Sequence, residues 1–202
     1  MGSEMCIRDR SETAQITSPR LCIFAGASFG LDARYADETR RLGSMLGARD
    51  FRFVYGGGRT GLMGSFASGA LEAGGHVTGI IPKFLETLEI GNKAVQELIV
   101  VDDMHTRKAM MYKGTDAFIV LPGGLGTLDE MMEVLTWNQL GIINAPVHIL
   151  NISGYWDHVV GMLHHATEEG FVHSKGLLHF SVADNADDLV DNLERQMADR
   201  SS

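Results

Sequence analysis

A short apolar run that passes through a glycine-rich turn into a helical pattern constrains the fold of this chain most. Residues 117–121 are apolar, and they lead into Leu121-Pro122-Gly123-Gly124-Leu125-Gly126-Thr127-Leu128-Asp129-Glu130. Beyond the turn, apolar side chains recur at helical spacing at Met131, Met132, Val134, Leu135, Trp137 and Leu140. The stretch therefore predicts a buried strand joined to a helix through a turn with three glycines.

The same alternation of strand and helix patterns extends along the chain. We expect strands at 21–25, 51–55, 76–81, 98–101, 117–121, 146–150 and 178–182. We expect helices at 33–49, from 62 to the glycines at 74–75, at 104–113, after the turn at 121–130, at 156–169 and at 186–197. Residues 83–97 are weakly periodic and are interpreted as a loop with a helical turn, a candidate lid. Such alternation predicts an α/β fold: a Rossmann-like, doubly wound, mostly parallel sheet with helices on both faces.

Length and composition indicate one domain and limit the classes of partner. A chain of 202 residues that is 45% hydrophobic builds one sizeable core, so we expect a domain at 19–198, a disordered or cloning-derived tail at 1–18 and a short tail at 199–202. A net charge of −9 argues against nucleic acid as a partner, and no apolar run approaches the roughly 20 residues of a membrane span. Two cysteines form no disulfide framework and the first residues lack the apolar segment of a signal peptide. We therefore expect a cytoplasmic protein.

The turn at 121–130 has two interpretations. Glycines allow close approach of a ligand to the backbone, and the first amides of a helix attract anions, phosphate above all. Alternatively, Thr127 and Glu130 fit a capping box with Thr127 as the cap. Capping alone leaves three glycines unexplained, which favours a phosphate site, although both interpretations can hold together.

A second glycine-rich turn, at 56–61, narrows the class of ligand. Gly56, Gly58 and Gly61 have the spacing of the dinucleotide fingerprint, but no carboxylate occupies residues 77–83, where the ribose partner of that fingerprint would stand. The chain also lacks the Lys-Ser or Lys-Thr pair of a Walker A loop. The ligand classes that remain are a nucleoside monophosphate and a sugar phosphate.

The segment Asp103-Met104-His105-Thr106-Arg107-Lys108 also indicates an anionic ligand. If Asp103 caps a helix here, Arg107 and Lys108 fall in its first two turns, where cations oppose the helix dipole. The alternative is a solvated basic patch paired with Asp102 or Asp103. The histidines at 158, 164 and 165 lack metal-site spacing, so we expect surface histidines or histidines satisfied by hydrogen bonds, and no metal site.

Three motifs together resemble those of a known family. Pro122 to Glu130 is similar to the signature Pro-Gly-Gly-x-Gly-Thr-x-x-Glu, Met104 to Lys108 to Met-x-x-Arg-Lys, and Tyr55 to Gly64 to a second glycine loop. They occur in order in the LOG ("lonely guy") family of cytokinin riboside 5′-monophosphate phosphoribohydrolases, whose members were often labelled lysine decarboxylases. The similarity covers about residues 21–193. One departure is Gly26-Ala27-Ser28, where the family usually has Gly-Ser-Ser.

The resemblance implies an enzyme that hydrolyses the bond between an adenine-type base and ribose 5′-phosphate. It implies Arg107 and Glu130 as the catalytic pair. The substrate-binding residues that it implies are Ser28, Gly57, Gly58, Met104, Lys108, Gly123, Gly124, Gly126 and Thr127. It further implies a homodimer with pockets near the subunit interface and no cofactor. Two alternatives stay open: a non-catalytic nucleotide-binding or sensing module, and a lysine decarboxylase, which would need a pyridoxal cofactor site.

Overall fold

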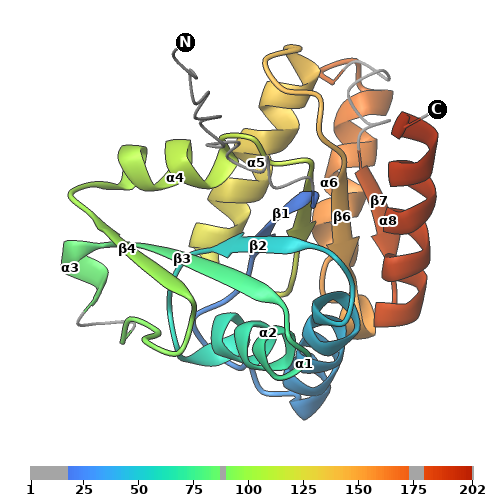
Figure 1. The fold of residues 1–202 in the computed structure, drawn as a ribbon. Coiled ribbons are helices and arrows are strands. Elements are labelled where there is room, and N and C mark those ends of the chain that lie inside the picture. Colours follow the sequence, from blue (N-terminus) through green and yellow to red (C-terminus); the bar gives the residue numbers. More distant parts are fainter. Residues whose placement is uncertain (1–17, 87–89, 173–179, 202) are drawn as a thin grey trace, which may run out of the picture.

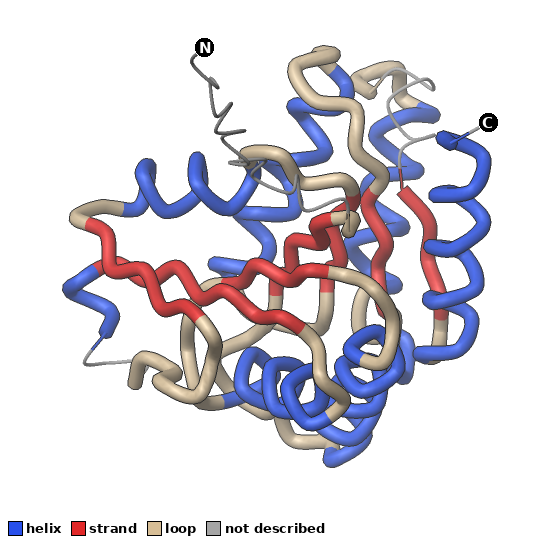
Figure 2. The backbone as a smooth tube through the Cα atoms, in the orientation of Figure 1, coloured by secondary structure: helices blue, strands red, loops and turns tan. Residues whose placement is uncertain are grey.

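The computed structural model describes residues 18–86, 90–172 and 180–201 (Figure 1). The tail predicted at residues 1–18 lies outside the described residues, apart from Ser18. The described chain forms a sheet between two layers of helices, as the alternating pattern predicts (Figure 2).

The sheet has seven strands, and every pair of neighbours is parallel. The strands are β1 (Arg20–Phe24), β2 (Arg52–Tyr55), β3 (His76–Pro82), β4 (Glu97–Val101), β5 (Ala117–Val120), β6 (Val147–Leu150) and β7 (Phe180–Ala183). Their order is β4-β3-β2-β1-β5-β6-β7. Strands β2, β3 and β4 are added in turn on one side of β1, and β5, β6 and β7 are added in turn on its other side. The switch point of the sheet therefore lies between β1 and β5, where ligands bind in such folds.

The helices divide between the two faces of the sheet. They are α1 (Ala33–Gly47), α2 (Gly61–Glu72), α3 (Lys83–Glu86), α4 (Met104–Tyr112), α5 (Leu125–Gln139), the 3-10 turn η1 (Ile152–Gly154), α6 (Asp157–Glu168) and α8 (Ala186–Ser201). Apolar residues of α1, α2 and α8 share one core cluster, and those of α4, α5 and α6 share the other. The sheet is thus doubly wound.

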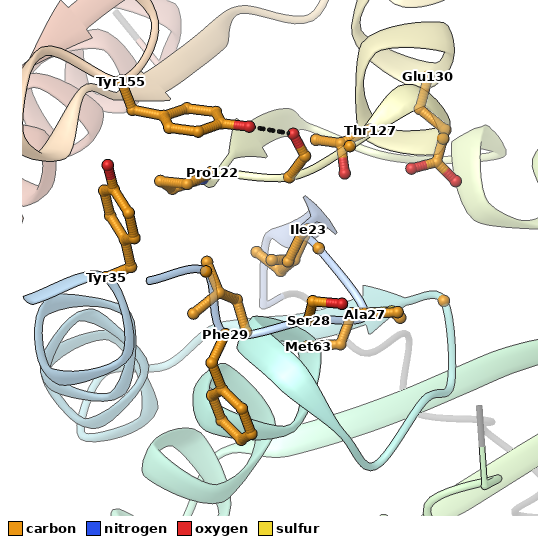
Figure 3. A pocket seen from close by; sticks show the side chains of 18 of the residues that line it. Ile23, Ala27, Ser28, Phe29, Tyr35, Met63, Pro122, Thr127, Glu130 and Tyr155 are labelled. Atoms are coloured by element: carbon orange, nitrogen blue, oxygen red, sulfur yellow. Dashed lines mark hydrogen bonds between the residues drawn. The ribbon is translucent and has the colours of Figure 1, made fainter. Parts of the chain in front are cut away.

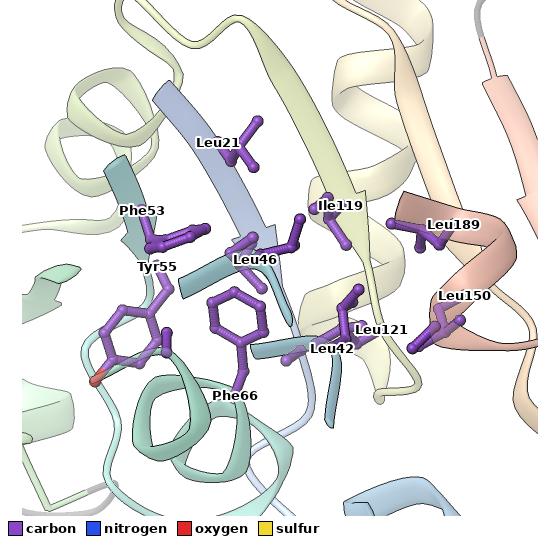
Figure 4. Packing of buried hydrophobic residues seen from close by; sticks show 14 of the residues in the cluster. Leu21, Leu42, Leu46, Phe53, Tyr55, Phe66, Ile119, Leu121, Leu150 and Leu189 are labelled. Atoms are coloured by element: carbon purple, nitrogen blue, oxygen red, sulfur yellow. The ribbon is translucent and has the colours of Figure 1, made fainter. Parts of the chain in front are cut away.

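The central strand β1 shows how the sequence produces this layering. Its side chains alternate between the faces: Leu21 and Ile23 join the first cluster, while Cys22 and Phe24 join the second. All four are at most 1% exposed. On the first face, the buried side chains of α1 and α2 pack beside those of the sheet (Figure 4). Burying each large apolar side chain contributes about 1.5–3 kcal/mol to the free energy of folding. Because a shift by one residue would expose these side chains, their burial fixes the strand register and hence the positions of the turns that follow the strands.

Two helix boundaries differ from the sequence prediction. Helix α5 begins at Leu125 with Gly124 as its N-cap and no side-chain hydrogen bond to that cap among the described residues, so the predicted capping box, with Thr127 as the cap, is wrong. Thr127 is already the third helical residue. Helix α8 continues to Ser201, four residues past the predicted end at Met197, because apolar burial predicts where a helix packs but not where an exposed end frays. Most of the other predicted boundaries agree within two residues; the strand predicted at 178–182 begins, within the described residues, at Phe180.

Candidate active site

A cavity of about 410 Å³ lies at the carboxyl ends of β1 and β5, the switch point of the sheet (Figure 3). This volume is within the range of about 300–1,000 Å³ that small-molecule sites occupy. Eight of the predicted site residues line it: Ser28, Met104, Arg107, Gly123, Gly124, Gly126, Thr127 and Glu130. The topology thus gathers residues from the turn after β1, from α4 and from the turn into α5.

The glycine turn after β5 offers backbone amides to this cavity. A side chain at Gly123 would overlap Thr127, so that glycine is required by internal packing. By contrast, a methyl group on Gly124 or Gly126 would meet no heavy atom within 4 Å. Both glycines line the cavity and are exposed. Packing against the described residues therefore does not explain them, whereas the close approach of a ligand does.

Thr127 and Ser28 add hydroxyl groups to the same wall. Thr127 is only 3% exposed, yet it lines the cavity, and its hydroxyl points into it (Figure 3). Ser28 lies in the exposed turn after β1. Together with the first amides of α5, which have no partner within the helix, these groups form a donor-rich concavity suited to an anion.

Arg107 enters the cavity from α4 and is 6% exposed. Its Nε donates to the carbonyl oxygen of Ile80 at 3.1 Å and its Nη2 to that of Gly56 at 3.0 Å. A side chain at Gly56 would overlap the guanidinium. The arginine is thus fixed to the ends of β2 and β3, and its orientation is set before any ligand arrives.

Asp103 confirms the predicted start of α4. Its Oδ1 accepts from the backbone N–H of Thr106 at 2.8 Å, and this hydrogen bond lowers the pKa of the Asp103 carboxyl. The cap determines where α4 begins and so how far along the helix Arg107 stands.

Glu130 stands in the second turn of α5, 7% exposed, with its carboxyl group facing the cavity (Figure 3). The charge of Glu130 also affects Cys22 of β1. Burial raises the pKa of the Cys22 thiol well above its ordinary value, and the charge of Glu130 raises it further. A carboxylate in such a dry setting interacts strongly with any cation that develops beside it.

Three predicted ligands lie outside the cavity lining: Gly57, Gly58 and Lys108. Gly57 has φ +80° and packs against Ile81, and Gly58 forms a β-bridge with Gly91. The positive φ therefore gives Gly57 a structural reason of its own, while Gly58 contributes its backbone to the bridge. The described part of the candidate lid, 83–86 and 90–97, is tied to this turn by the hydrogen bond from Asn92 N to Gly57 O at 2.9 Å.

Lys108 forms ion pairs between α4 and α5. Its Nζ lies 2.6 Å from Asp129 Oδ2 and 3.1 Å from Glu133 Oε2. Burial lowers the pKa of Lys108, but the hydrogen bonds to the two carboxylates outweigh it and leave the pKa above its ordinary value. Lys108 follows Arg107 in the sequence, and Asp129 precedes Glu130. The ion pair of Lys108 with Asp129 therefore links the residues next to Arg107 and Glu130.

The sequence reasoning missed several residues of the cavity, chiefly Tyr35, Met63 and Tyr155. Tyr155 follows β6 at the same edge of the sheet as the glycine turns. Its position just after a predicted strand is therefore the sequence signal that could have identified it as a cavity residue. Tyr35, in the first turn of α1, and Met63, in that of α2, follow the turns after β1 and β2.

The described residues contain no group of three or more His, Cys, Asp or Glu that could hold a metal ion. The histidines at 158, 164 and 165 are exposed, as predicted. Within the described ranges, no helix is both long and apolar enough to cross a membrane.

Comparisons with known proteins agree with the motifs. The family described as "Possible lysine decarboxylase" matches residues 63–193. Cytokinin riboside 5′-monophosphate phosphoribohydrolase LOG1 of Arabidopsis thaliana is 47% identical over 176 residues, which are 87% of this chain and 82% of the relative. The probable cytokinin riboside 5′-monophosphate phosphoribohydrolase LOGL2 of Oryza sativa subsp. japonica is 41% identical over 196 residues, 94% of this chain and 80% of the relative.

Solved structures support the fold. A molybdenum cofactor carrier protein from Chlamydomonas reinhardtii superposes with a TM-score of 0.67 at 18% identity, over 90% of this chain and 99% of the other. The structure titled TM1055 superposes with a TM-score of 0.64 at 22% identity, over 88% of this chain and 99% of the other. At such identities the likeness concerns the fold alone. The sequence matches go further: the chain belongs to the LOG family, the group of phosphoribohydrolases whose family description is possible lysine decarboxylase.

Proposed function

We propose that this protein hydrolyses the N-glycosidic bond of adenine-type nucleoside 5′-monophosphates, such as cytokinin riboside monophosphates and AMP, releasing the free base and ribose 5-phosphate. The observation that carries the proposal is the shared cavity. It combines two glycines that internal packing does not require with a buried carboxylate, Glu130, and a buried guanidinium, Arg107. The names of the relatives point to the same reaction.

The phosphate binds at the start of α5. The amides of Gly124 and Gly126, with the hydroxyls of Thr127 and Ser28, donate hydrogen bonds to its oxygens, and the helix dipole favours its charge. Gly123 lets Thr127 pack beside the turn. This anchoring leaves the ribose one turn further along α5, beside Glu130.

Glu130 and Arg107 carry the chemistry. Cleavage passes through an oxocarbenium-like transition state, and the carboxylate of Glu130 stabilises this positive charge while it orients and deprotonates the attacking water. The C1′–N bond breaks, the water oxygen bonds to C1′, and the base leaves with the electron pair of the broken bond and takes up a proton. Arg107 stabilises the negative charge that builds up on the departing base, and its fixed geometry avoids reorganisation during the reaction.

The remaining predicted ligands support this arrangement. Met104 lines the cavity one helical turn before Arg107 and provides apolar contact to the substrate. Lys108 assists binding through its ion pairs with α5, which hold the helix of Arg107 against that of Glu130. Gly57 and Gly58 shape the turn whose neighbour, Gly56, accepts the hydrogen bond from Arg107.

One experiment tests the function directly. Purified protein is incubated with AMP, with isopentenyladenosine monophosphate and with the corresponding free nucleosides, and the released base and ribose 5-phosphate are measured. We expect cleavage of the monophosphates and little cleavage of the nucleosides. Equal cleavage of both would refute the phosphate-anchored mechanism, and binding without cleavage would support the alternative of a non-catalytic nucleotide-binding or sensing module.

Lysine decarboxylation is disfavoured by the chemistry of the cavity. A pyridoxal cofactor needs a lysine for its Schiff base. The described residues that line the cavity include no lysine, and Lys108 is engaged with Asp129 and Glu133. We expect activity without a cofactor and a protein solution that does not absorb in the pyridoxal band.

We expect a cytoplasmic homodimer. Leu125, Leu140 and Ile142 are 85%, 65% and 62% exposed at the two ends of α5, beside the cavity at its start and beyond its last turn. Because such side chains are ordinary when they are scattered singly, the expectation of a dimer rests on the family and not on these residues alone. Light scattering coupled to size-exclusion chromatography measures the mass in solution; a monomer at micromolar concentration would contradict the expectation.

A further inference from the structure

Tyr155 contacts the glycine turn from a distant part of the chain. It lies between η1 and α6, and its hydroxyl donates to the carbonyl oxygen of Gly123 at 2.5 Å (Figure 3). We propose that Tyr155 is a positioning residue that orients the peptide between Gly123 and Gly124 for phosphate binding. The proposal rests on the proposed function, because it assigns Tyr155 to the phosphate end of that site.

The geometry of a peptide unit links the tyrosine to the cavity. The peptide between Gly123 and Gly124 is trans, so its C=O and N–H point in opposite directions. When Tyr155 holds the carbonyl of Gly123, the N–H of Gly124 points away from the tyrosine. Gly124 lines the cavity, and its amide has no acceptor among the described residues. The hydroxyl therefore fixes the direction of an amide that is available to a ligand.

The other two carbonyls of the turn are held by the backbone. The carbonyl of Pro122 accepts from the N–H of Gly26 at 3.0 Å, and that of Gly124 accepts from the N–H of Leu128 at 3.0 Å. Among the described residues, a side chain holds only the middle carbonyl, that of Gly123. Its peptide is flanked by glycines, whose dihedral angles are the least restricted of any residue. Without the tyrosine hydroxyl, this peptide can rotate.

Tyr155 is itself firmly placed. The loop after β6 is organised by the buried side chain of Asn151, whose Oδ1 accepts from Trp156 N at 2.7 Å and whose Nδ2 donates to Asp157 Oδ1 at 2.8 Å. The ring of Tyr155 packs edge-on against that of Tyr35, with centroids 5.5 Å apart. A Tyr155→Phe variant retains this ring packing and loses only the hydroxyl.

The test compares phosphate affinity with turnover in Tyr155→Phe. Loss of a neutral hydrogen bond that orients one donor raises the KM for AMP, and the inhibition constant of inorganic phosphate, by about 3- to 10-fold. We expect kcat to stay close to the parental value, because Glu130 and Arg107 are untouched. A fall in kcat with an unchanged KM, or parental phosphate inhibition, would overturn the proposal.

Two controls separate this role from a structural one and from the function itself. Thr167→Val removes another hydroxyl that donates to a backbone carbonyl, that of Leu163 at 3.0 Å in α6, outside the cavity lining; it should leave the KM and phosphate inhibition unchanged. Calorimetric titration of both variants with inorganic phosphate needs no turnover. A parental protein that cleaves neither AMP nor isopentenyladenosine monophosphate would therefore refute the function, while equal phosphate affinity in parent and Tyr155→Phe would refute the role of Tyr155.

Discussion

Replacing Gly126 by alanine is expected to raise stability while lowering activity. Gly126 is the second residue of α5, and a methyl group there would have no heavy atom within 4 Å. Alanine in place of glycine inside a helix stabilises it by about 0.5–1 kcal/mol, which raises the melting temperature of a domain of this size by about 1–4 °C. The fold should therefore tolerate the change or benefit from it.

The activity should respond in the opposite direction. The methyl group occupies space at the cavity wall, where the phosphate is proposed to accept a hydrogen bond from the Gly126 amide. A hydrogen bond to a charged group contributes about 1.5–3 kcal/mol, so its loss lowers kcat/KM for AMP by about 10- to 100-fold. Most of this loss should be in KM, because the bond forms on binding.

Gly161→Ala is the matched control. Gly161 is an exposed residue within α6, and a methyl group there also meets no heavy atom within 4 Å. The same gain in melting temperature is expected, measured by circular dichroism, with parental activity. If Gly126→Ala cleaves AMP with the parental kcat/KM, the phosphate does not approach this amide and the reasoning is refuted.

Four further substitutions test the proposed catalytic pair, its support and the core. Glu130→Gln should still bind AMP in calorimetry but lose kcat by about 10²–10⁴-fold. Arg107→Lys should lower kcat on the order of 100-fold, measured by steady-state kinetics, because an ammonium group lacks the planar fork that bonds Ile80 O and Gly56 O. Gly56→Ala should lower the free energy of unfolding in urea by about 1–3 kcal/mol and also kcat, since its methyl group would overlap the Arg107 guanidinium. Burial lowers the pKa of His148 to about 4. On acidification the unfolded chain therefore binds a proton at this residue before the folded chain does, and the free energy of unfolding falls between about pH 6.5 and 4. His148→Gln should reduce the fall in the free energy of unfolding between pH 7 and pH 5, measured in urea, by about 2 kcal/mol.

The fold follows from the sequence because local and global signals agree. Runs such as that of β5, four buried residues between an aspartate and the turn, have the length and composition of a strand covered on both faces. Their alternation with helices leaves the doubly wound sheet as the solution. The capping box failed because Thr127 and Glu130 have the right types and spacing, but Gly124 already caps the helix. Sequence spacing cannot distinguish a cap from a third helical residue.

The candidate site is predictable only where its residues lie within a motif. Eight of the predicted residues line the cavity because the turns after β1 and β5 and the start of α4 carry local signals. Tyr155 reaches Gly123 across 32 positions of sequence, and this contact depends on β6 lying beside β5 in the sheet. Lys108 shows the same limit: its charge suggested an anionic ligand or a pair with Asp102 or Asp103, but its ion pairs in the structure are with Asp129 and Glu133. Which neighbours a side chain meets is a tertiary property.

The two glycine turns show how one residue type serves two purposes. In the turn after β2, Gly56 leaves room for the Arg107 guanidinium, Gly57 has φ +80°, and Gly61 has φ +64° and packs against the backbone of Ala27. Internal packing and backbone conformation thus explain Gly56 and Gly61, two of the three glycines whose spacing resembles a dinucleotide fingerprint without its acidic partner. In the turn after β5, Gly124 and Gly126 meet no such constraint. We therefore propose that the first turn fixes Arg107, the proposed catalytic cation, and that the second receives the phosphate, so that the shared cavity depends on both.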